Sequence, residues 1–260
     1  MIPLQEQERL KKYFDERLTG GVKIEHFTQR PLSILVAGRD ECRFCAETGR
    51  TLEELRALSP KISLRVHELS EAAKLAAGYG IERVPATVFR GQLNRALRFD
   101  GFPGAGLFPP LIDALVSASR GSTELDGRSK RSLQRIRERL DIRLFVSPSS
   151  PYCPPMTALA YAFGLENQRL RVSIIEVDEF PRLAEGMRLR AVPTTVIGAR
   201  ARFVGAVDAD VFIDQIANAA EGRSLTASEG VFGTPAGPST PLGGAPEPRT
   251  SPSGLILPGR

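Results

Sequence analysis

The sequence contains no tryptophan, and aromatic residues make up only 7% of its 260 residues. Proteins that bind single-stranded nucleic acid stack the bases on aromatic side chains, so this scarcity argues against that function. The chain also has only three cysteines, too few for the disulfide framework of a small secreted domain. The shortage of these residue types therefore argues against two broad classes of protein before any motif is considered.

Long apolar runs and a strong excess of one charge are missing as well. No stretch approaches the roughly 18 apolar residues of a membrane span, and residues 1–10 carry charges where a signal peptide has an unbroken apolar segment. The 35 basic and 30 acidic residues give a net charge of +5, too small to indicate a phosphate-binding surface. We therefore expect a cytoplasmic protein that binds neither a membrane nor nucleic acid.

Residues 128–139 form the densest basic stretch of the chain. Leu133, Ile136 and Leu140 recur there at helical spacing. This periodicity predicts an amphipathic helix over residues 129–140, with its basic side chains facing solvent rather than a ligand.

The two halves of the sequence repeat one order of patterns. A buried-strand pattern at residues 32–37 precedes Cys42-Arg-Phe-Cys45, and a similar pattern at residues 142–146 precedes Ser150-Pro-Tyr-Cys153. Cys45 and Cys153 lie 108 positions apart (153 − 45), as do the two prolines of the Val-Pro segments, at 85 and 193 (193 − 85). An offset that stays constant over several elements indicates a duplication.

Each copy reads as αβαβαββα, which predicts a mixed sheet with helices on both faces. The further strands are expected at residues 62–66, 83–88, 97–101, 170–175, 191–196 and 202–205, and the outer helices at 5–18, 106–119, 129–140 and 208–220. Residues 223–260 hold seven prolines and seven glycines among 38 residues, which predicts disorder. We therefore expect three parts: a first unit at residues 1–120, a second at 121–222 and a tail at 223–260.

The chemistry of the chain is expected at its Cys-x-x-Cys pair. Cys42 and Cys45 follow a predicted strand and open a predicted helix, where free N–H groups and the helix dipole favour a thiolate at Cys42. The same spacing can form half of a zinc site, but the remaining candidates, Cys153, His26 and His67, are not paired at ligand spacing. We expect no metal and no cofactor, and a purely structural role for the two cysteines stays open as an alternative.

Pro85 lies in a Val-Pro-Ala-Thr-Val segment that otherwise reads as a strand, and a proline entering a strand needs an explanation. A strand, a Cys-x-x-Cys helix, a helix, a strand and then Val-Pro resemble the thioredoxin fold. This resemblance implies that Pro85 and Pro193 follow cis peptide bonds. It also implies that Pro85 lies beside the redox pair and that Val84 offers its backbone to an extended substrate segment.

Two such units, each with an extra helix before it, resemble the two-domain protein disulfide oxidoreductases of the glutaredoxin-like type over residues 1–222. The resemblance implies an α/β fold of two tandem thioredoxin-like units, each a central mixed sheet flanked by helices. It also implies a thiol–disulfide oxidoreductase that reduces or exchanges the disulfides of protein substrates through Cys42 and Cys45. The electron donor would be either a thioredoxin-reductase-like protein or glutathione.

The second unit departs from that family at its active site, where the family normally carries Cys-Pro-Tyr-Cys. Ser150 replaces the attacking cysteine, and a serine hydroxyl is a poor nucleophile without a base, while the second half has no histidine. We expect Ser150 and Pro151 to form the N-cap and first position of the helix. We expect Cys153 to be a buried core residue. The second site, with its groove at Val192 and Pro193, would then be degenerate and redox-inactive.

Two other functions remain open on the sequence alone. A duplicated fold that has lost one site could use the other only to hold a partner, as a non-catalytic binding module. Alternatively, the first site could act as a glutathione-dependent glutaredoxin. A binding module would show no thiol-dependent turnover, whereas an enzyme would. The identity of the electron donor distinguishes a glutaredoxin from an enzyme that depends on thioredoxin reductase.

Overall fold

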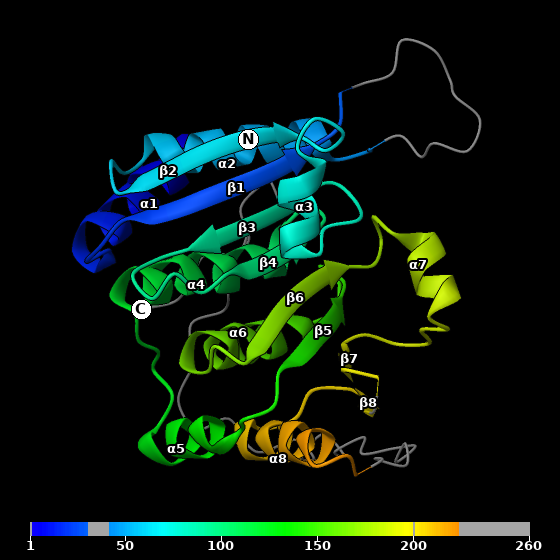
Figure 1. Ribbon diagram of the computed structural model, residues 1–260. Helices are drawn as coiled ribbons and strands as arrows, with labels where there is room; N and C mark the ends of the chain where they lie inside the picture. The colour runs from blue at the N-terminus through cyan, green and yellow to red at the C-terminus, as the bar shows by residue number, and fades with distance from the viewer. Residues whose placement is uncertain (1, 31–41, 200, 224–260) are drawn as a thin grey trace, which may run out of the picture.

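A computed structural model describes residues 2–30, 42–199 and 201–223 of the chain (Figure 1). Both halves have the predicted order of elements. The first half contains α1 (Leu4–Arg17), β1 (Val22–Thr28), α2 (Cys45–Ala57), β2 (Ile62–Glu68), α3 (Ala73–Tyr79), β3 (Ala86–Arg90), β4 (Leu97–Asp100), a short 3-10 turn η1 (Ala105–Leu107) and α4 (Phe108–Arg120). The second half contains α5 (Gly127–Arg135), β5 (Leu140–Val146), α6 (Cys153–Glu166), β6 (Leu170–Glu176), α7 (Pro181–Gly186), β7 (Thr194–Ile197), β8 (Ala201–Val204) and α8 (Ala209–Ala220).

The described strands form one eight-stranded mixed sheet in the order β2-β1-β3-β4-β6-β5-β7-β8. In each half the first strand is parallel to the second and antiparallel to the third, and the last two strands are antiparallel. The halves meet where β4 pairs in parallel with β6, with Leu97 opposite Val172. The mixed α/β fold with a thioredoxin-like sheet is therefore as predicted, but the sheets of the two units join into one.

The hydrophobic core lies on both faces of this sheet. One large cluster fills the face covered by α4 and α6 and continues across both halves (Figure 1). On the other face a small cluster around Phe27 and Val88 lies under α3, and a corresponding cluster around Phe145 and Val196 lies under α7. The continuous core, together with the β4–β6 pairing, ties the two halves into one packed structure.

The structure describes a strand earlier in the chain than the one predicted before the cysteine pair. The expected strand at residues 32–37 lies outside the described residues, and β1 (Val22–Thr28) pairs with both β2 and β3 in the first half of the sheet. β1 begins 118 positions before β5 (140 − 22), not 108, because the first half has ten more residues between this strand and its cysteine position. The constant offset of 108 therefore holds only from the cysteine position to the strand after the Val-Pro segment, β3 in the first half and β7 in the second.

The predicted helix over residues 129–140 is shorter than expected and begins earlier. The Asp126 carboxylate accepts the backbone N–H groups of Arg128 and Ser129 at 2.8 and 3.0 Å and starts α5 at Gly127. The helix ends at Arg135, and the Leu140 N–H donates instead to the carbonyl of Arg169, the residue before β6. The apolar spacing correctly indicated burial of Leu140, but the strand ladder, not the helix, buries it.

None of the helices in the described ranges is both long and apolar enough to cross a membrane. The predicted tail lies outside the described residues, apart from Arg223.

Candidate functional site

A disulfide joins Cys42 and Cys45, whose Cα atoms are 5.5 Å apart. Cys45 is the first residue of α2 and is buried, whereas Cys42 precedes the helix and is half-buried. The helix was expected to open at Cys42. It opens three residues later, because the Phe44 carbonyl accepts both the N–H and the hydroxyl of Thr48, at 2.9 and 2.8 Å. The pair is therefore asymmetric, with one sulfur held in the helix and the other nearer to solvent.

The loop between the cysteines is held by aromatic contacts. The Arg43 guanidinium lies 4.9 Å from the centre of the Phe44 ring. The Phe44 ring in turn stacks on Phe102, just after β4, with ring centres 5.8 Å apart and an interplanar angle of 17°. The loop is thus attached to the end of β4 as well as to α2.

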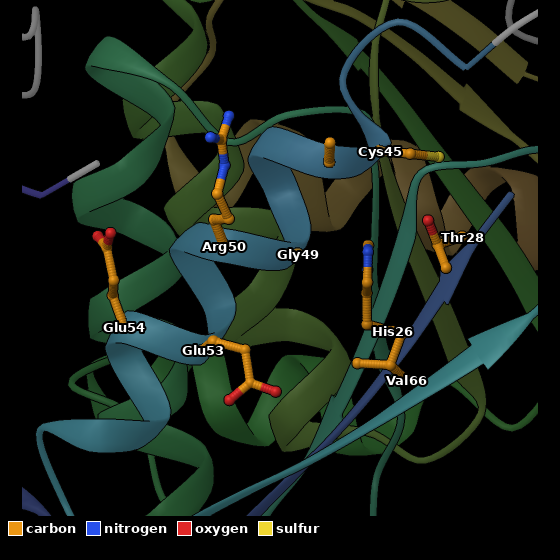
Figure 2. Close-up of a pocket in the computed structure, with 9 residues that line it drawn as sticks. His26, Thr28, Cys45, Gly49, Arg50, Glu53, Glu54 and Val66 are labelled. Carbon is orange, nitrogen blue, oxygen red and sulfur yellow. The ribbon is translucent and has the colours of Figure 1, made fainter. Parts of the chain in front are cut away.

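His26 lies on β1 beneath the first turn of α2, and its ring points toward Cys45 (Figure 2). The side chain is fully buried, and its Nδ1 atom lies 3.2 Å from the Thr87 hydroxyl on β3. Burial lowers the pKa of His26 to about 4, although the backbones of Ala86 and Cys45 act in the opposite direction. His26 and Cys45 also line one pocket together with Gly49.

From the sequence, His26 is a candidate only for metal binding, and its position beside Cys45 is not predicted. Val22, Ile24 and His26 alternate along the strand, so the twofold periodicity of a strand places His26 on the face that α2 covers. Within the described ranges no group of histidine, cysteine or acidic side chains could hold a metal ion.

We expect the buried His26 to make the protein less stable in acid. Its pKa of about 4 lies below the ordinary value of 6.5, so between these pH values the unfolded chain takes up a proton that the native state excludes. This contribution is fully present above pH 6.5 and is lost as the pH falls toward 4, by about 2–3 kcal/mol between pH 7 and pH 4.5. Urea unfolding at both pH values measures it.

His26→Gln removes the titrating group while keeping a polar side chain. The variant should lose less stability than the parent protein when the pH is lowered from 7 to 4.5. Equal losses in the two proteins would show that His26 does not carry this acid sensitivity.

The Val-Pro segment forms a corner next to the disulfide. The Val84–Pro85 peptide bond is cis, as expected. Pro85 is buried and its carbonyl accepts the Gly101 N–H at 2.8 Å, while Val84 is half-buried and lies before the first residue of β3. The backbones of Ala86 and Cys45 both lie against the His26 ring, which brings this corner and the cysteine pair to the same end of the sheet.

The second half repeats the corner. The Val192–Pro193 peptide bond is also cis, and the Pro193 carbonyl accepts the Gly205 N–H at 2.8 Å, as Pro85 does with Gly101 in the first half. Pro193 is buried and Val192 is half-buried. Both corners thus share one backbone arrangement.

The cysteine position of the second half differs from that of the first. Cys153 is fully buried and is the first residue of α6. Burial raises the pKa of its thiol, against the opposing effects of the Ser147 N–H, which donates to the sulfur at 3.4 Å, and of the Ser150 hydroxyl. A buried thiol with a raised pKa is a weak nucleophile at neutral pH.

Ser150 and Pro151 do not form the expected start of α6. Tyr152 is the N-cap residue and makes no side-chain cap, and the Ser150 carbonyl accepts the Cys153 N–H at 3.2 Å within a turn before the helix. The hydroxyl of Ser150 faces the Cys153 thiol instead of capping the helix. Pro154 occupies the second helical position. The N–H groups of the first turn have no acceptor within the helix, so a proline is tolerated there.

The acidic residues Glu176, at the end of β6, and Asp178, in the following turn, are not singled out by the sequence pattern. The Ser147 hydroxyl donates to Asp178 at 2.7 Å. Burial raises the pKa of Glu176 to about 7, and a Cβ at Gly101 would lie only 2.7 Å from the Cβ of Glu176. The turn after β6 in the second half therefore packs closely against the end of β4 in the first.

Comparisons with known proteins identify the fold. No protein-family model and no curated protein matches the sequence. Among solved structures, a protein disulfide oxidoreductase from Aeropyrum pernix is 23% identical, with 86% of this chain and 96% of that chain covered and a TM-score of 0.74. The NTD_N/C domain of alkylhydroperoxide reductase AhpF from Enterococcus faecalis is 20% identical, with 83% and 100% covered and a TM-score of 0.72. At these identities the similarity establishes the thioredoxin-like fold.

Proposed function

We propose that this chain is a thiol–disulfide oxidoreductase that reduces or exchanges the disulfides of protein substrates. The observation that carries the proposal is the Cys42–Cys45 disulfide at the start of α2, within a thioredoxin-like fold. The similarity in fold to a protein disulfide oxidoreductase and to a domain of alkylhydroperoxide reductase supports it. We assign the activity to the first unit, residues 1–120.

Cys42 is the attacking residue in this proposal, because it is the more exposed of the two cysteines. Its thiolate attacks one sulfur of the substrate disulfide, and the other sulfur leaves as a thiolate that takes up a proton. The Cys45 thiol then gives up its proton and attacks the Cys42 sulfur. This step releases the second substrate thiol and closes the Cys42–Cys45 bond, so two electrons have passed to the substrate.

The electrons that reopen the Cys42–Cys45 disulfide come from a second partner. A thioredoxin-reductase-like protein or glutathione could supply them, since both reduce a disulfide by thiol–disulfide exchange, here at the sulfur of Cys42. The protein itself needs no cofactor for this exchange.

We place the substrate against Val84 and Pro85. Val84 lies before the first residue of β3, so its backbone is outside the ladder that β3 forms with β1 and β4. An extended segment on either side of a substrate disulfide could add to this backbone as a short strand. The neighbouring corner would then hold the disulfide beside Cys42.

The second unit, residues 121–222, is redox-inactive in this proposal. The second half contains no histidine to activate Ser150, and the lone thiol of Cys153 is fully buried. The groove at Val192 and Pro193 keeps the backbone corner without a reactive pair.

Insulin reduction in the presence of dithiothreitol tests the proposal. The full chain should accelerate precipitation of the insulin B chain several-fold over dithiothreitol alone, because dithiothreitol regenerates the Cys42–Cys45 dithiol. A non-catalytic binding module would leave the rate unchanged. Replacing dithiothreitol by glutathione with its reductase, or by thioredoxin reductase, then identifies the electron donor.

A further inference from the structure

The two Val-Pro corners lie along one edge of the sheet. Ala86 and Thr194, the residues that follow the two prolines, belong to one row of paired residues that runs from β3 through β4, β6 and β5 to β7. Neighbouring strands are about 4.8 Å apart, so the four spacings between β3 and β7 place the corners about 19 Å from each other. An extended chain covers that distance with about six residues.

One loop of the first half contacts both cysteine positions. Phe102, just after β4, stacks on Phe44 of the first cysteine loop, with ring centres 5.8 Å apart. Further along the same loop, a Cβ at Gly106 would lie 3.2 Å from Cγ of Pro154 and 3.7 Å from the carbonyl oxygen of Pro148, on either side of the second cysteine position. The second site therefore adjoins the first through residues 102–106.

Tyr152 in the second half corresponds to Phe44 in the first. Each precedes the first residue of its helix, with φ −110° and ψ 9° at Phe44 and φ −86° and ψ −15° at Tyr152. Phe44 is half-buried beside Phe102, whereas Tyr152 is 58% exposed. No ring contact among the described residues involves Tyr152. The same aromatic position is thus covered in the first half and open in the second.

A single residue accounts for this difference. Gly101 and Gly205 have similar positive φ angles, 112° and 99°, and each donates its N–H to the proline carbonyl of its corner. The next residue is Phe102 in the first half and Ala206, which is exposed, in the second. The second half therefore keeps the aromatic residue beside its corner but lacks the ring that would cover it.

We propose that the second unit binds the protein substrate, with an aromatic side chain of the substrate stacked on Tyr152 as Phe102 stacks on Phe44. This inference rests on the proposed function, because the substrate disulfide lies at Cys42 at the same time. Val192 lies two residues before β7, so its backbone is outside the ladders that β7 forms with β5 and β8. The substrate backbone pairs with it there as a short strand.

The spacing of the two corners defines the class of substrate. A segment that reaches from Cys42 to Tyr152 is extended and carries its aromatic residue about six positions from the reactive cysteine. A helical or tightly folded segment of that length is too short, because a helix rises only about 1.5 Å per residue. The substrates are therefore proteins whose disulfide lies in an extended or unfolded segment.

Binding of a peptide that cannot exchange disulfides tests this surface directly. The probe is a cysteine-free dodecapeptide of serine, glycine and valine with one phenylalanine, and its partner peptide has alanine at that position. NMR titration of the full chain should give a dissociation constant about two- to tenfold lower for the phenylalanine peptide, the range of one aromatic pair. In Tyr152→Ala the two peptides should bind equally, because the ring that distinguishes them is gone.

Ala206→Phe gives the second half the ring that the first half has. The variant keeps Tyr152 but covers it, so the phenylalanine peptide should bind more weakly by about the same factor. Leu93→Ala is the matched control, because Leu93 is 43% exposed in the turn between β3 and β4, at the opposite end of the sheet from the corners. Its binding should be unchanged, and urea unfolding of each variant shows that it is folded.

A preference for the phenylalanine peptide that persists in Tyr152→Ala would overturn the inference, and so would parental affinity in Ala206→Phe. Turnover gives a second test, with dithiothreitol as the donor. Tyr152→Ala should raise the KM for insulin and leave kcat unchanged, because a contact made equally in the ground and transition states is lost. Reduction of hydroxyethyl disulfide, which has no peptide segment, should keep the parent rate.

The two substrates also separate this inference from the proposed function. An equal loss on both in Tyr152→Ala would contradict a role in substrate binding. A parent protein that accelerates the reduction of neither would refute the proposed redox function. The peptide titrations involve no exchange, so they would still test the surface at Tyr152 in that case.

Discussion

Cys42→Ser is expected to reduce thiol-dependent insulin reduction to the uncatalysed rate. The exchange begins when an accessible thiolate attacks the substrate, and a serine hydroxyl stays protonated at neutral pH and is a poor nucleophile. Cys45 cannot take over, because it is only 5% exposed and is held as the first residue of α2. The measurement is the initial rate of insulin reduction at equal protein concentration, with far-ultraviolet circular dichroism to show that the variant is folded.

Cys153→Ser is the natural control for this loss, since it removes the only cysteine outside the Cys42–Cys45 pair. Its rate should stay close to that of the parent protein, because Cys153 is fully buried and has no second cysteine in its own half. A relay from Cys42 to Cys153 would require their Cα atoms to approach within about 7 Å. Near-normal turnover in Cys42→Ser, or severe loss in a folded Cys153→Ser, would contradict the assignment of the activity to the first half.

The order of elements could be predicted because the periodic patterns of the two halves support each other. A single Val-Pro segment is a weak signal, but the same segment 108 positions later, with the same distance to a cysteine, predicts the same corner twice. Both corners have the expected cis peptide bond. Local periodicity and an internal repeat were sufficient here because the type of each element is set by its own residue pattern, which the second copy repeats.

The strand β1 could not be predicted in this way, because its buried polar residues find their partners far along the chain. Glu25 is buried and pairs with His67 at 2.6 Å and with Arg90 at 3.5 Å, and both partners lie on other strands. From the sequence alone, a segment with Lys, Glu and His looks less like a buried strand than the apolar residues 32–37 do.

The joining of the two halves also lies beyond local patterns. Pairing of β4 with β6 needs the edges of two predicted sheets to meet, and nothing in either strand specifies the partner. What permits the contact is a close approach of α6 to the seam. Gly164 lies on this helix, and a Cβ there would come within 2.8 Å of Leu97 and 2.9 Å of Val172, the two residues paired across the seam.

Gly164→Leu is therefore expected to destabilise the protein by about 3 kcal/mol or more. A leucine side chain at this position must displace either α6 or the paired strands, because the neighbouring atoms are side chains of a fully buried core. Gly164→Ala should cost less, about 1–2 kcal/mol, since its single methyl group still meets Leu97 and Val172 but improves the helical propensity of the position. The midpoint of urea unfolding measures both.

Gly78→Ala provides the contrast that isolates the lack of space at the seam. Gly78 is an exposed residue within α3, and nothing lies within 4 Å of where its Cβ would be. The same substitution there should stabilise the protein by about 0.5–1 kcal/mol, because alanine restricts the unfolded chain and favours the helix. Opposite signs for alanine at the two positions are expected if α6 rests directly on the β4–β6 seam. A stabilising Gly164→Ala would mean instead that the helix stands further from the sheet, and that the two halves are held together without this contact.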